Sequence, residues 1–329
     1  MTGKVGATMR RHVLAGMTGI IVAFTASLPA SAATYPEKAI RIIVPVAAGG
    51  STDLVARIFQ MTIERLKLLP QPLVIVNNAA AGGTVGTRMI KDAEPDGYTL
   101  GIWHMGLLTA AAMGVTDYDH TAFDLVAQVG AIEVGLAVKS DSKIASLKEL
   151  VAEAKARPGQ VSAAMNIGLL PHFVPLMFAS EAGIDFRWVQ AGGGSVRLRS
   201  VLGNHTEFSL FSVPEFVTFG PQGIRPLVVF SSARHPRVAN VPTAAELGYN
   251  FTFSEAILWL APRGTPKDRV DVVAKAIEAS MRDDDFKKRY DEQGIDPAYI
   301  PGDKLKAVLD QRMTGIKAVA AQVKAAKTN

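Results

Sequence analysis

The feature that most constrains this chain is a regular alternation of short apolar runs with segments of helical periodicity. The runs 39–46, 73–76 and 98–103 have the length and the near-continuous apolar character of strands buried on both faces of a parallel sheet. Between the first two runs, apolar residues recur at a spacing that fits one helix face: Val55, Ile58, Phe59, Thr62 and Leu66. A second helix is expected over 85–93, and this β-α-β-α-β order predicts a doubly wound α/β domain.

A second set of α/β elements is expected after residue 126. The apolar stretch 126–138 is long enough to leave the first domain, and Ser146 with Glu149 predicts a capping box that opens a helix. Four further strands are expected, at 161–165, 186–190, 207–211 and 226–231. The apolar run 256–261 can carry the chain back, and mostly helical sequence follows from Thr265. Two α/β units joined by two apolar crossings predict two lobes, with a ligand crevice at the carboxyl ends of the strands.

The first 32 residues have the three parts of a secretory signal peptide. Lys4, Arg10 and Arg11 give a basic start, residues 13–28 form an uncharged apolar run, and Ala32 ends a small-residue cleavage site. The apolar run is shorter than the roughly 20 residues of a spanning helix. Cleavage near Ala32 and export are therefore expected, with an uncleaved N-terminal anchor as the alternative. The mature chain is expected to form lobe 1 from residues 33–132 and 254–329, and lobe 2 from residues 133–253.

Composition and motif content exclude several classes of function. The chain has 35 Lys+Arg against 30 Asp+Glu, and removing residues 1–32 leaves 297 residues with a net charge of +2, so no nucleic-acid partner is expected. The absence of Cys excludes disulfides, Cys-ligated metals and a thiol nucleophile. The sequence has no P-loop, no G-x-S-x-G and no H-E-x-x-H, and its glycines do not form a dinucleotide fingerprint. No enzyme activity, cofactor or metal is therefore expected.

Two glycine-rich loops are candidate anion sites. Gly49-Gly50-Ser51-Thr52 joins a buried strand to a helix, where free N–H groups and hydroxyls favour an anionic ligand. An ordinary strand–helix connection capped by Ser51 remains open. Gly192-Gly193-Gly194-Ser195 lies in a similar place in the second unit and is the weaker candidate. Trp103-His104-Met105 ends a strand, where side chains face a crevice. Among the phenylalanines, Phe173 and Phe211 are expected nearest to that crevice.

Four motifs follow one another over nearly the whole chain after residue 34. They are Y-P-E-K-A-I-R-I-I-V-P-V-A-A-G-G-S-T-D-L-V-A-R at 35–57, P-D-G-Y-T-L at 95–100, V-P-T-A-A-E-L-G at 241–248 and L-A-P-R-G-T-P at 260–266. In this combination the sequence resembles the tripartite tricarboxylate transporter substrate-binding family, also called Bug-type extracytoplasmic solute receptors. The resemblance implies a periplasmic binding protein of the second type: two α/β lobes, two crossing strands and a clamped ligand. It also implies a carboxylate ligand and, as partner, a membrane transporter with a large and a small integral subunit.

In this family a ligand carboxylate is held largely by loop amides, hydroxyls and ordered water. The matching residues of lobe 1 are Gly50, Ser51 and Thr52, and the matching loop of lobe 2 is 163–168, leading to His172. This chain differs from the family in the size of the side chains at the expected crevice. Larger residues replace the usual small ones in loop 163–168, Trp103-His104-Met105 replaces a small polar loop, and Phe211-Ser212 replaces the usual Asp-Asn. The departures predict a more apolar crevice and an aromatic or otherwise hydrophobic carboxylate.

The sequence therefore predicts a monomeric receptor that captures a carboxylate by lobe closure and delivers it to the transporter. The ligand-binding residues are expected to be Gly49, Gly50, Ser51, Thr52, Trp103, His104, Met105, Met165, Asn166, Ile167, His172 and Phe211. His104 is expected either to pair with a distal carboxylate when protonated or to pack as a neutral ring. Two other functions stay open: a sensor that presents its ligand to a membrane kinase, and a periplasmic hydrolase.

Overall fold

The computed structural model describes residues 35–326, with side chains described to residue 321. Its first half is a parallel sheet in which β1 (Ile40–Val44) lies between β2 (Leu73–Asn77) and β3 (Thr99–His104). Helix α1 (Ser51–Arg65) connects β1 to β2, and α2 (Thr84–Lys91) connects β2 to β3. The predicted β-α-β-α-β order is confirmed. The expected signal peptide lies outside the described residues.

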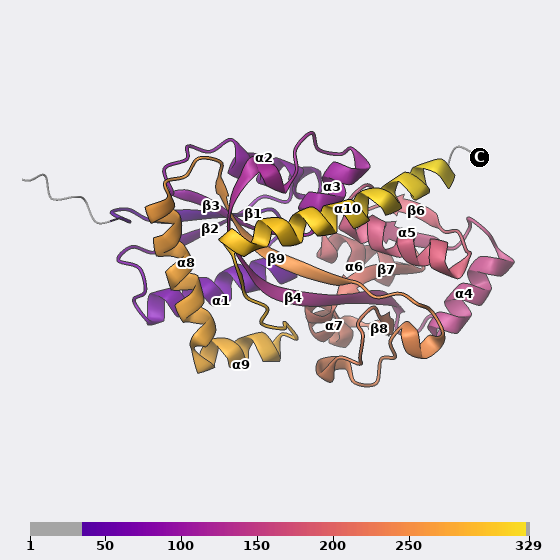
Figure 1. The fold of residues 1–329 in the computed structure, drawn as a ribbon. Helices are drawn as coiled ribbons and strands as arrows, with labels where there is room; N and C mark the ends of the chain where they lie inside the picture. Colours follow the sequence, from indigo (N-terminus) through magenta and orange to yellow (C-terminus); the bar gives the residue numbers. More distant parts are fainter. Residues whose placement is uncertain (1–34, 327–329) are drawn as a thin grey trace, which may run out of the picture. The chain divides into compact units, whose positions relative to one another are not determined.

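Two long strands connect this first half of the sheet to a second half. Strand β9 (Ser254–Pro262) lies between β3 and β4 (Phe123–Lys139) and is antiparallel to both. Residues 123–133 of β4 pair with β9, whereas the part of β4 from Val134 onward pairs with β7 (Phe208–Ser212) and β8 (Ile224–Val229). One strand thus changes its neighbours halfway along its length, and Figure 1 shows β4 and β9 running side by side.

The second half of the sheet repeats the parallel pattern. Strand β5 (Ser162–Met165) pairs in parallel with β6 (Arg187–Gln190) and β7, so the order through both halves is β2-β1-β3-β9-β4-β7-β5-β6. Its helices are α4 (Leu147–Ala156), α5 (Leu170–Ala182), α6 (Gly194–Leu202) and α7 (Val213–Phe219). Helix α4 begins at the predicted cap: the Glu149 N–H donates to Ser146 Oγ at 3.2 Å, and the Glu149 carboxylate accepts from Ala145 N–H. The fold is therefore the two-part α/β architecture that the sequence predicts.

The remaining elements are helices around the sheet and one short strand, which pairs antiparallel with β4. They are α3 (Gly106–Met113), α8 (Lys267–Arg282), α9 (Asp284–Glu292), β10 (Ile300–Pro301), α10 (Gly302–Ala326) and five short 3₁₀ helices: η1 (Ala80–Gly83), η2 (His120–Ala122), η3 (Gly220–Gln222), η4 (Pro236–Val238) and η5 (Ala245–Leu247). Helix α3, an apolar helix that follows β3 directly, is not among the elements predicted from the sequence. Among residues 35–326, no helix is both long enough and apolar enough to cross a membrane.

The core has a separate layer on each face of the first half. Because side chains alternate along a strand, Ile42 of β1 packs toward α1, α8 and α9, whereas Ile43 packs into the larger core toward α10. The predicted face of α1 is buried, and Phe59 meets the Trp259 ring edge-on at 5.5 Å. Leu66 does not follow the prediction: α1 ends at Arg65, and Leu66 is 37% exposed because the chain turns away there.

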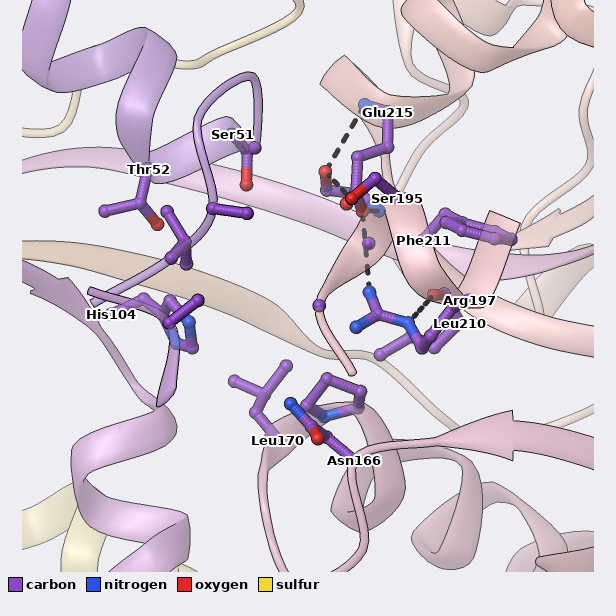
Figure 2. A pocket seen from close by; sticks show the side chains of 18 of the residues that line it. Ser51, Thr52, His104, Asn166, Leu170, Ser195, Arg197, Leu210, Phe211 and Glu215 are labelled. Carbon is purple, nitrogen blue, oxygen red and sulfur yellow. Dashed lines mark hydrogen bonds and ion pairs between the residues drawn. The ribbon is translucent and has the colours of Figure 1, made fainter. Parts of the chain in front are cut away.

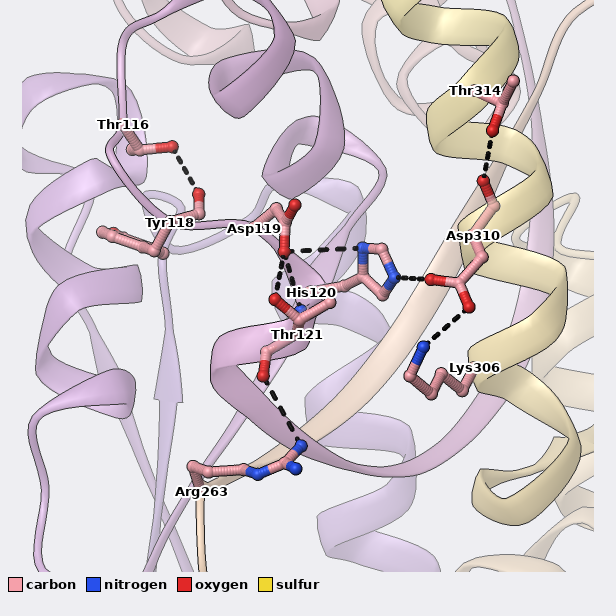
Figure 3. A network of polar contacts seen from close by, with 9 residues as sticks. All are labelled: Thr116, Tyr118, Asp119, His120, Thr121, Arg263, Lys306, Asp310 and Thr314. Atoms are coloured by element: carbon pink, nitrogen blue, oxygen red, sulfur yellow. Dashed lines mark hydrogen bonds and ion pairs between the residues drawn. The ribbon is translucent and has the colours of Figure 1, made fainter.

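Helix α10 is fixed to the start of β4 by a buried histidine. His120 Nε2 lies 2.8 Å from Asp310 Oδ1 of α10, and Asp310 also accepts from Lys306 Nζ at 2.7 Å (Figure 3). His120 Nδ1 faces Asp119 at 3.9 Å. Helix α10 packs against α3 and β4, and also against α5 of the second half. The C-terminal helix therefore touches both halves of the sheet.

Candidate ligand-binding site

A cavity of about 290 Å³ lies where the first and second halves of the sheet face each other. Its first-half wall is the loop from β1 to α1 together with the end of β3. Its second-half wall comes from the starts of α5, α6 and α7 and the end of β7 (Figure 2). Much of the lining is apolar: Pro45, Val46, Trp103, Val134, Leu169, Leu170, Leu210, Phe211 and Phe219. The cavity thus has room for a small ligand with an apolar body.

The loop from β1 to α1 presents unused donors to the cavity. Gly49 has a φ of +82°, a conformation that glycine adopts without strain, and Gly50 caps α1 with no side-chain hydrogen bond to the first-turn amides. Ser51 and Thr52 follow as the first residues of the helix. Thr52 is only 1% exposed, and its Oγ1 has no hydrogen-bond partner among the described residues. A buried hydroxyl without a partner, beside the amides of a helix start, suits an incoming carboxylate.

Asp53 holds this loop from behind and does not line the cavity. Its carboxylate accepts from Gly49 N–H at 2.8 Å, from Arg57 Nε at 2.9 Å and from Asn77 Nδ2 at 2.9 Å. Burial alone would raise the pKa of Asp53, but the hydrogen bonds from Arg57, Gly49 and Asn77 outweigh it and hold the pKa below its ordinary value. Asp53 is therefore a fixed anion that shapes the loop.

The end of β3 forms the adjoining wall. The rings of Trp103 and His104 stack with centroids 3.8 Å apart. Trp103 is 4% exposed and packs so closely on Gly83 that a Cβ there would lie 2.6 Å from the indole ring. His104 already has a carboxylate partner, because its Nδ1 lies 2.7 Å from Glu255 Oε1 and also 2.9 Å from the Gly106 N–H. The imidazole is thus positioned by the chain itself.

The second half contributes an amide, a hydroxyl and a guanidinium. Asn166 follows β5, accepts from Gln190 Nε2 at 3.3 Å and lies so close to Gly82 that a Cβ there would be 3.1 Å from its Nδ2. Asn166 therefore sits where the two halves approach each other. Ser195 lies in the first turn of α6, and Arg197, two residues further, donates to the carbonyl oxygens of Leu210 and Gly192, each at 3.3 Å.

Eight of the twelve predicted residues line this cavity and four do not. The eight are Gly49, Gly50, Ser51, Thr52, Trp103, His104, Asn166 and Phe211. Phe211 is 1% exposed and packs mainly against Phe219.

The other four predicted residues lie in the core or on the surface. Met105 and Met165 are buried in the core: Met105 lies directly before α3, and Met165 is the last residue of β5. His172 is buried in α5, where its Nδ1 accepts from Gly168 N–H and its ring meets Trp188 edge-on. Ile167 is 44% exposed on the surface.

Sequence reasoning missed three charged residues of the cavity wall: Arg197, Glu215 and Glu255. Glu215 had a readable signal, since Ser212-x-x-Glu215 is a capping box, which the structure contains in full. Glu255 stands at the entry of a strand that is otherwise apolar, which is unusual for a buried strand. Arg197 had no local signal, because only the contact between α6 and β7 buries it.

The fold and the inter-lobe cavity define a periplasmic binding protein. The structure matches the periplasmic binding protein BugD with a TM-score of 0.82 and 26% identity, over 88% of this chain and 99% of that one. It matches MatC from Rhodopseudomonas palustris with bound malate with a TM-score of 0.78 and 26% identity, over 88% of this chain and 99% of that one.

The sequence comparisons identify the family. Residues 55–323 match the model of the tripartite tricarboxylate transporter family receptor. Protein BugT of Bordetella pertussis is 30% identical over 321 residues, which cover 92% of this chain and 96% of that protein. The chain therefore belongs to the tripartite tricarboxylate transporter receptor family, a family of periplasmic solute-binding proteins, and the resemblance seen in the sequence is confirmed.

Proposed function

We propose that this protein is a periplasmic receptor for a carboxylate with an apolar body. The observation that carries the proposal is the start of α1, where the buried Thr52 hydroxyl has no partner among the described residues and lines the cavity beside uncapped amides. Ser51 and Thr52 would hold the carboxylate from the first half, and Asn166 would contact the ligand from the second. The malate bound to MatC, a relative in fold and sequence, supports a carboxylate ligand.

Ligand capture would proceed by closure of two lobes, residues 33–132 with 254–329 and residues 133–253. The change of partners along β4 at Val134 supports these boundaries. The apolar lining around Trp103 and Phe211 supports an aromatic or otherwise hydrophobic ligand body over a short dicarboxylate. A ligand that contacts both lobes binds the closed form better and therefore shifts the equilibrium toward it.

A thermal-shift screen of the mature chain against a carboxylate library tests the ligand class. A bound ligand raises stability by RT ln(1 + [L]/Kd), about 2.7 kcal/mol at a hundredfold excess over Kd. Titration calorimetry then ranks aromatic acids against succinate and citrate. Tight succinate or citrate binding without any aromatic acid binding would refute the hydrophobic ligand, and no shift with any carboxylate would refute the function.

A glycine variant tests the site. Gly50→Leu should abolish binding and leave the fold intact, since Gly50 has an ordinary φ of −75° and the atoms nearest to a Cβ there belong to Val46 and Ala47 of the same loop, the closest being the Ala47 carbonyl oxygen at 3.3 Å. Gly220→Leu is the matched control, because nothing lies within 4 Å of a Cβ at Gly220 and that residue does not line the cavity. Unchanged affinity in Gly50→Leu would remove this loop from the site.

The same proposal includes export with cleavage near Ala32, action as a monomer and delivery to the two membrane subunits of a tripartite transporter. The family supports this partner. Cells that express the membrane subunits should take up the ligand only when the receptor is present. Uptake that does not depend on the receptor, together with ligand-dependent kinase signalling, would favour a sensor instead. Ester hydrolysis that is lost in Ser51→Ala would favour a hydrolase.

A further inference from the structure

The cavity wall carries two buried carboxylates, which is unusual for a site that receives an anion. Of the described residues that line it, four are titratable: His104, Arg197, Glu215 and Glu255. Glu215 is 7% exposed and Glu255 is 5% exposed. Burying an unpaired charge costs much free energy, so buried charged side chains normally have partners within the protein. The partners of these four residues therefore determine which donors and acceptors of the wall remain free to contact a ligand.

Glu215 already occupies the anion position at the start of α6. Its Oε2 accepts from Ser212 N–H at 2.9 Å and lies 3.8 Å from Arg197 Nη2. Its Oε1 lies against the first residue of α6, since a Cβ on Gly194 would be 1.8 Å away. Figure 2 shows Glu215, Ser195 and Arg197 together on this side of the cavity. A helix start beside a guanidinium is where a second ligand carboxylate would bind, and the chain fills that place with its own.

Two of the three nitrogens of Arg197 already donate within the chain, and the third faces a carboxylate. Its Nε and Nη1 donate to main-chain carbonyl oxygens of Leu210 and Gly192, and its charge faces Glu215. Burial lowers the pKa of Arg197 below its ordinary value, while the charges of Glu215 and Glu255 act in the opposite direction. One guanidinium thus faces two carboxylates in the wall.

Glu255 projects from β9 into the same cavity. One oxygen, Oε1, lies 2.7 Å from His104 Nδ1, and its other oxygen has no partner among the described residues. Figure 2 shows His104, the partner of this carboxylate, on the same wall as Thr52, and the charge of Glu255 also acts on Arg197 of the opposite wall. Glu255 is an acceptor that a ligand group with an N–H can reach.

We propose, on the basis of the carboxylate-receptor function above, that Glu215 and Glu255 determine specificity by excluding a second ligand carboxylate. They select a monocarboxylate whose far end carries a cationic amine. The ligand carboxylate binds at the start of α1, its apolar body fills the cavity, and its amine faces Glu255. The negative charges of Glu215 and Glu255 repel the second carboxylate of a dicarboxylate, so the site gains specificity by disfavouring the wrong ligand.

The test compares matched ligands by titration calorimetry on the mature chain. One series is 4-(aminomethyl)benzoate, 4-methylbenzoate and terephthalate, and the other is 6-aminohexanoate, hexanoate and adipate. In at least one series the amine should bind at least tenfold more tightly than the neutral analogue, and the dicarboxylate more weakly than both. A dicarboxylate that binds as tightly as its amine counterpart overturns the proposal and leaves the carboxylate function standing. Absence of binding by all six also overturns it, and the library screen then decides separately on the function.

Isosteric variants assign the effect to the two carboxylates. Glu255→Gln should reduce the preference for the amine over the dicarboxylate at least tenfold, and Glu215→Gln should strengthen dicarboxylate binding. Glu64→Gln is the control, because Glu64 is an exposed residue of α1 and its replacement changes the net charge equally. Circular dichroism confirms that each variant is folded. An amine preference that Glu255→Gln leaves unchanged in a folded protein refutes the role of Glu255.

Discussion

Replacing the Thr52 hydroxyl by a methyl group should weaken ligand binding without weakening the fold. Thr52→Val keeps the branched shape and a similar helix propensity, so α1 itself is little disturbed. The hydroxyl is buried and has no partner among the described residues, so its removal breaks no hydrogen bond of the described chain. The unfolding free energy of the ligand-free protein should therefore stay the same or rise by up to about 1 kcal/mol.

The affinity should change far more. A hydrogen bond to a charged carboxylate contributes about 1.5–3 kcal/mol, which corresponds to a loss of roughly tenfold to 150-fold in Kd. Thr62 supplies a matched control on the same helix: it is also 1% exposed, and its Oγ1 is likewise without a partner among the described residues. Ten residues place it about 15 Å further along α1, at the helical rise of 1.5 Å per residue. Thr62→Val should leave Kd unchanged.

Urea unfolding followed by circular dichroism measures the stability of both variants, and calorimetry with the strongest ligand from the carboxylate screen measures Kd. A change in Kd of less than threefold in Thr52→Val would refute the role of this hydroxyl in carboxylate binding. A loss of stability of more than 1 kcal/mol in Thr52→Val alone would show that the hydroxyl is structural. Equal losses of affinity in the two variants would place the effect in the helix as a whole.

Three further predictions concern charged groups outside the cavity. Burial and the charge of Asp296 raise the pKa of Glu133 to about 7, so the unfolding free energy should fall as pH rises from about 5 to 8. Glu133→Gln should remove this pH dependence and raise the unfolding free energy at pH 8 by about 1–2 kcal/mol, measured by urea unfolding. His120→Ala should lower the unfolding free energy by about 2–3 kcal/mol, because it leaves a void beneath α10 and removes a partner of Asp310, with Kd unchanged. Asp53→Ala should lower the unfolding free energy by about 2–4 kcal/mol and weaken ligand binding more than tenfold, because it removes the carboxylate that holds the loop from β1 to α1 through the Gly49 N–H. Wild-type affinity in this variant would contradict the positioning role of Asp53.

Much of the fold was predictable because its signals are local. A buried strand followed by Gly-Gly-Ser-Thr is legible in a few consecutive residues, and the structure puts this loop on the cavity. The side chains that face the cavity at the strand ends were harder to predict, because a shift of one residue along a strand moves the side chain to the opposite face of the sheet. Asn166 lines the cavity whereas its neighbour Met165 is buried in the core.

The charged wall was not predictable, because its partners are far apart in sequence. Glu255 meets His104 across the pairing of β9 with β3, and Glu215 meets Arg197 only after α6 and α7 pack beside β7. No periodicity or short motif reports such a pairing. The family resemblance also gave no help there, because it favours amides and hydroxyls over charged groups.

The place of β9 in the sheet has a consequence for the order of folding. In the first half, β9 lies between β3 and β4, yet it is made only after all the strands of the second half. A chain that emerges from the ribosome N-terminus first can therefore complete the second half before the first, although the first half begins earlier in the sequence. Until Pro262 has been added, β3 lacks its antiparallel neighbour, and β1, β2 and β3 can pair only with one another. The first half, which is begun first, is therefore the last part of the sheet to be completed during synthesis.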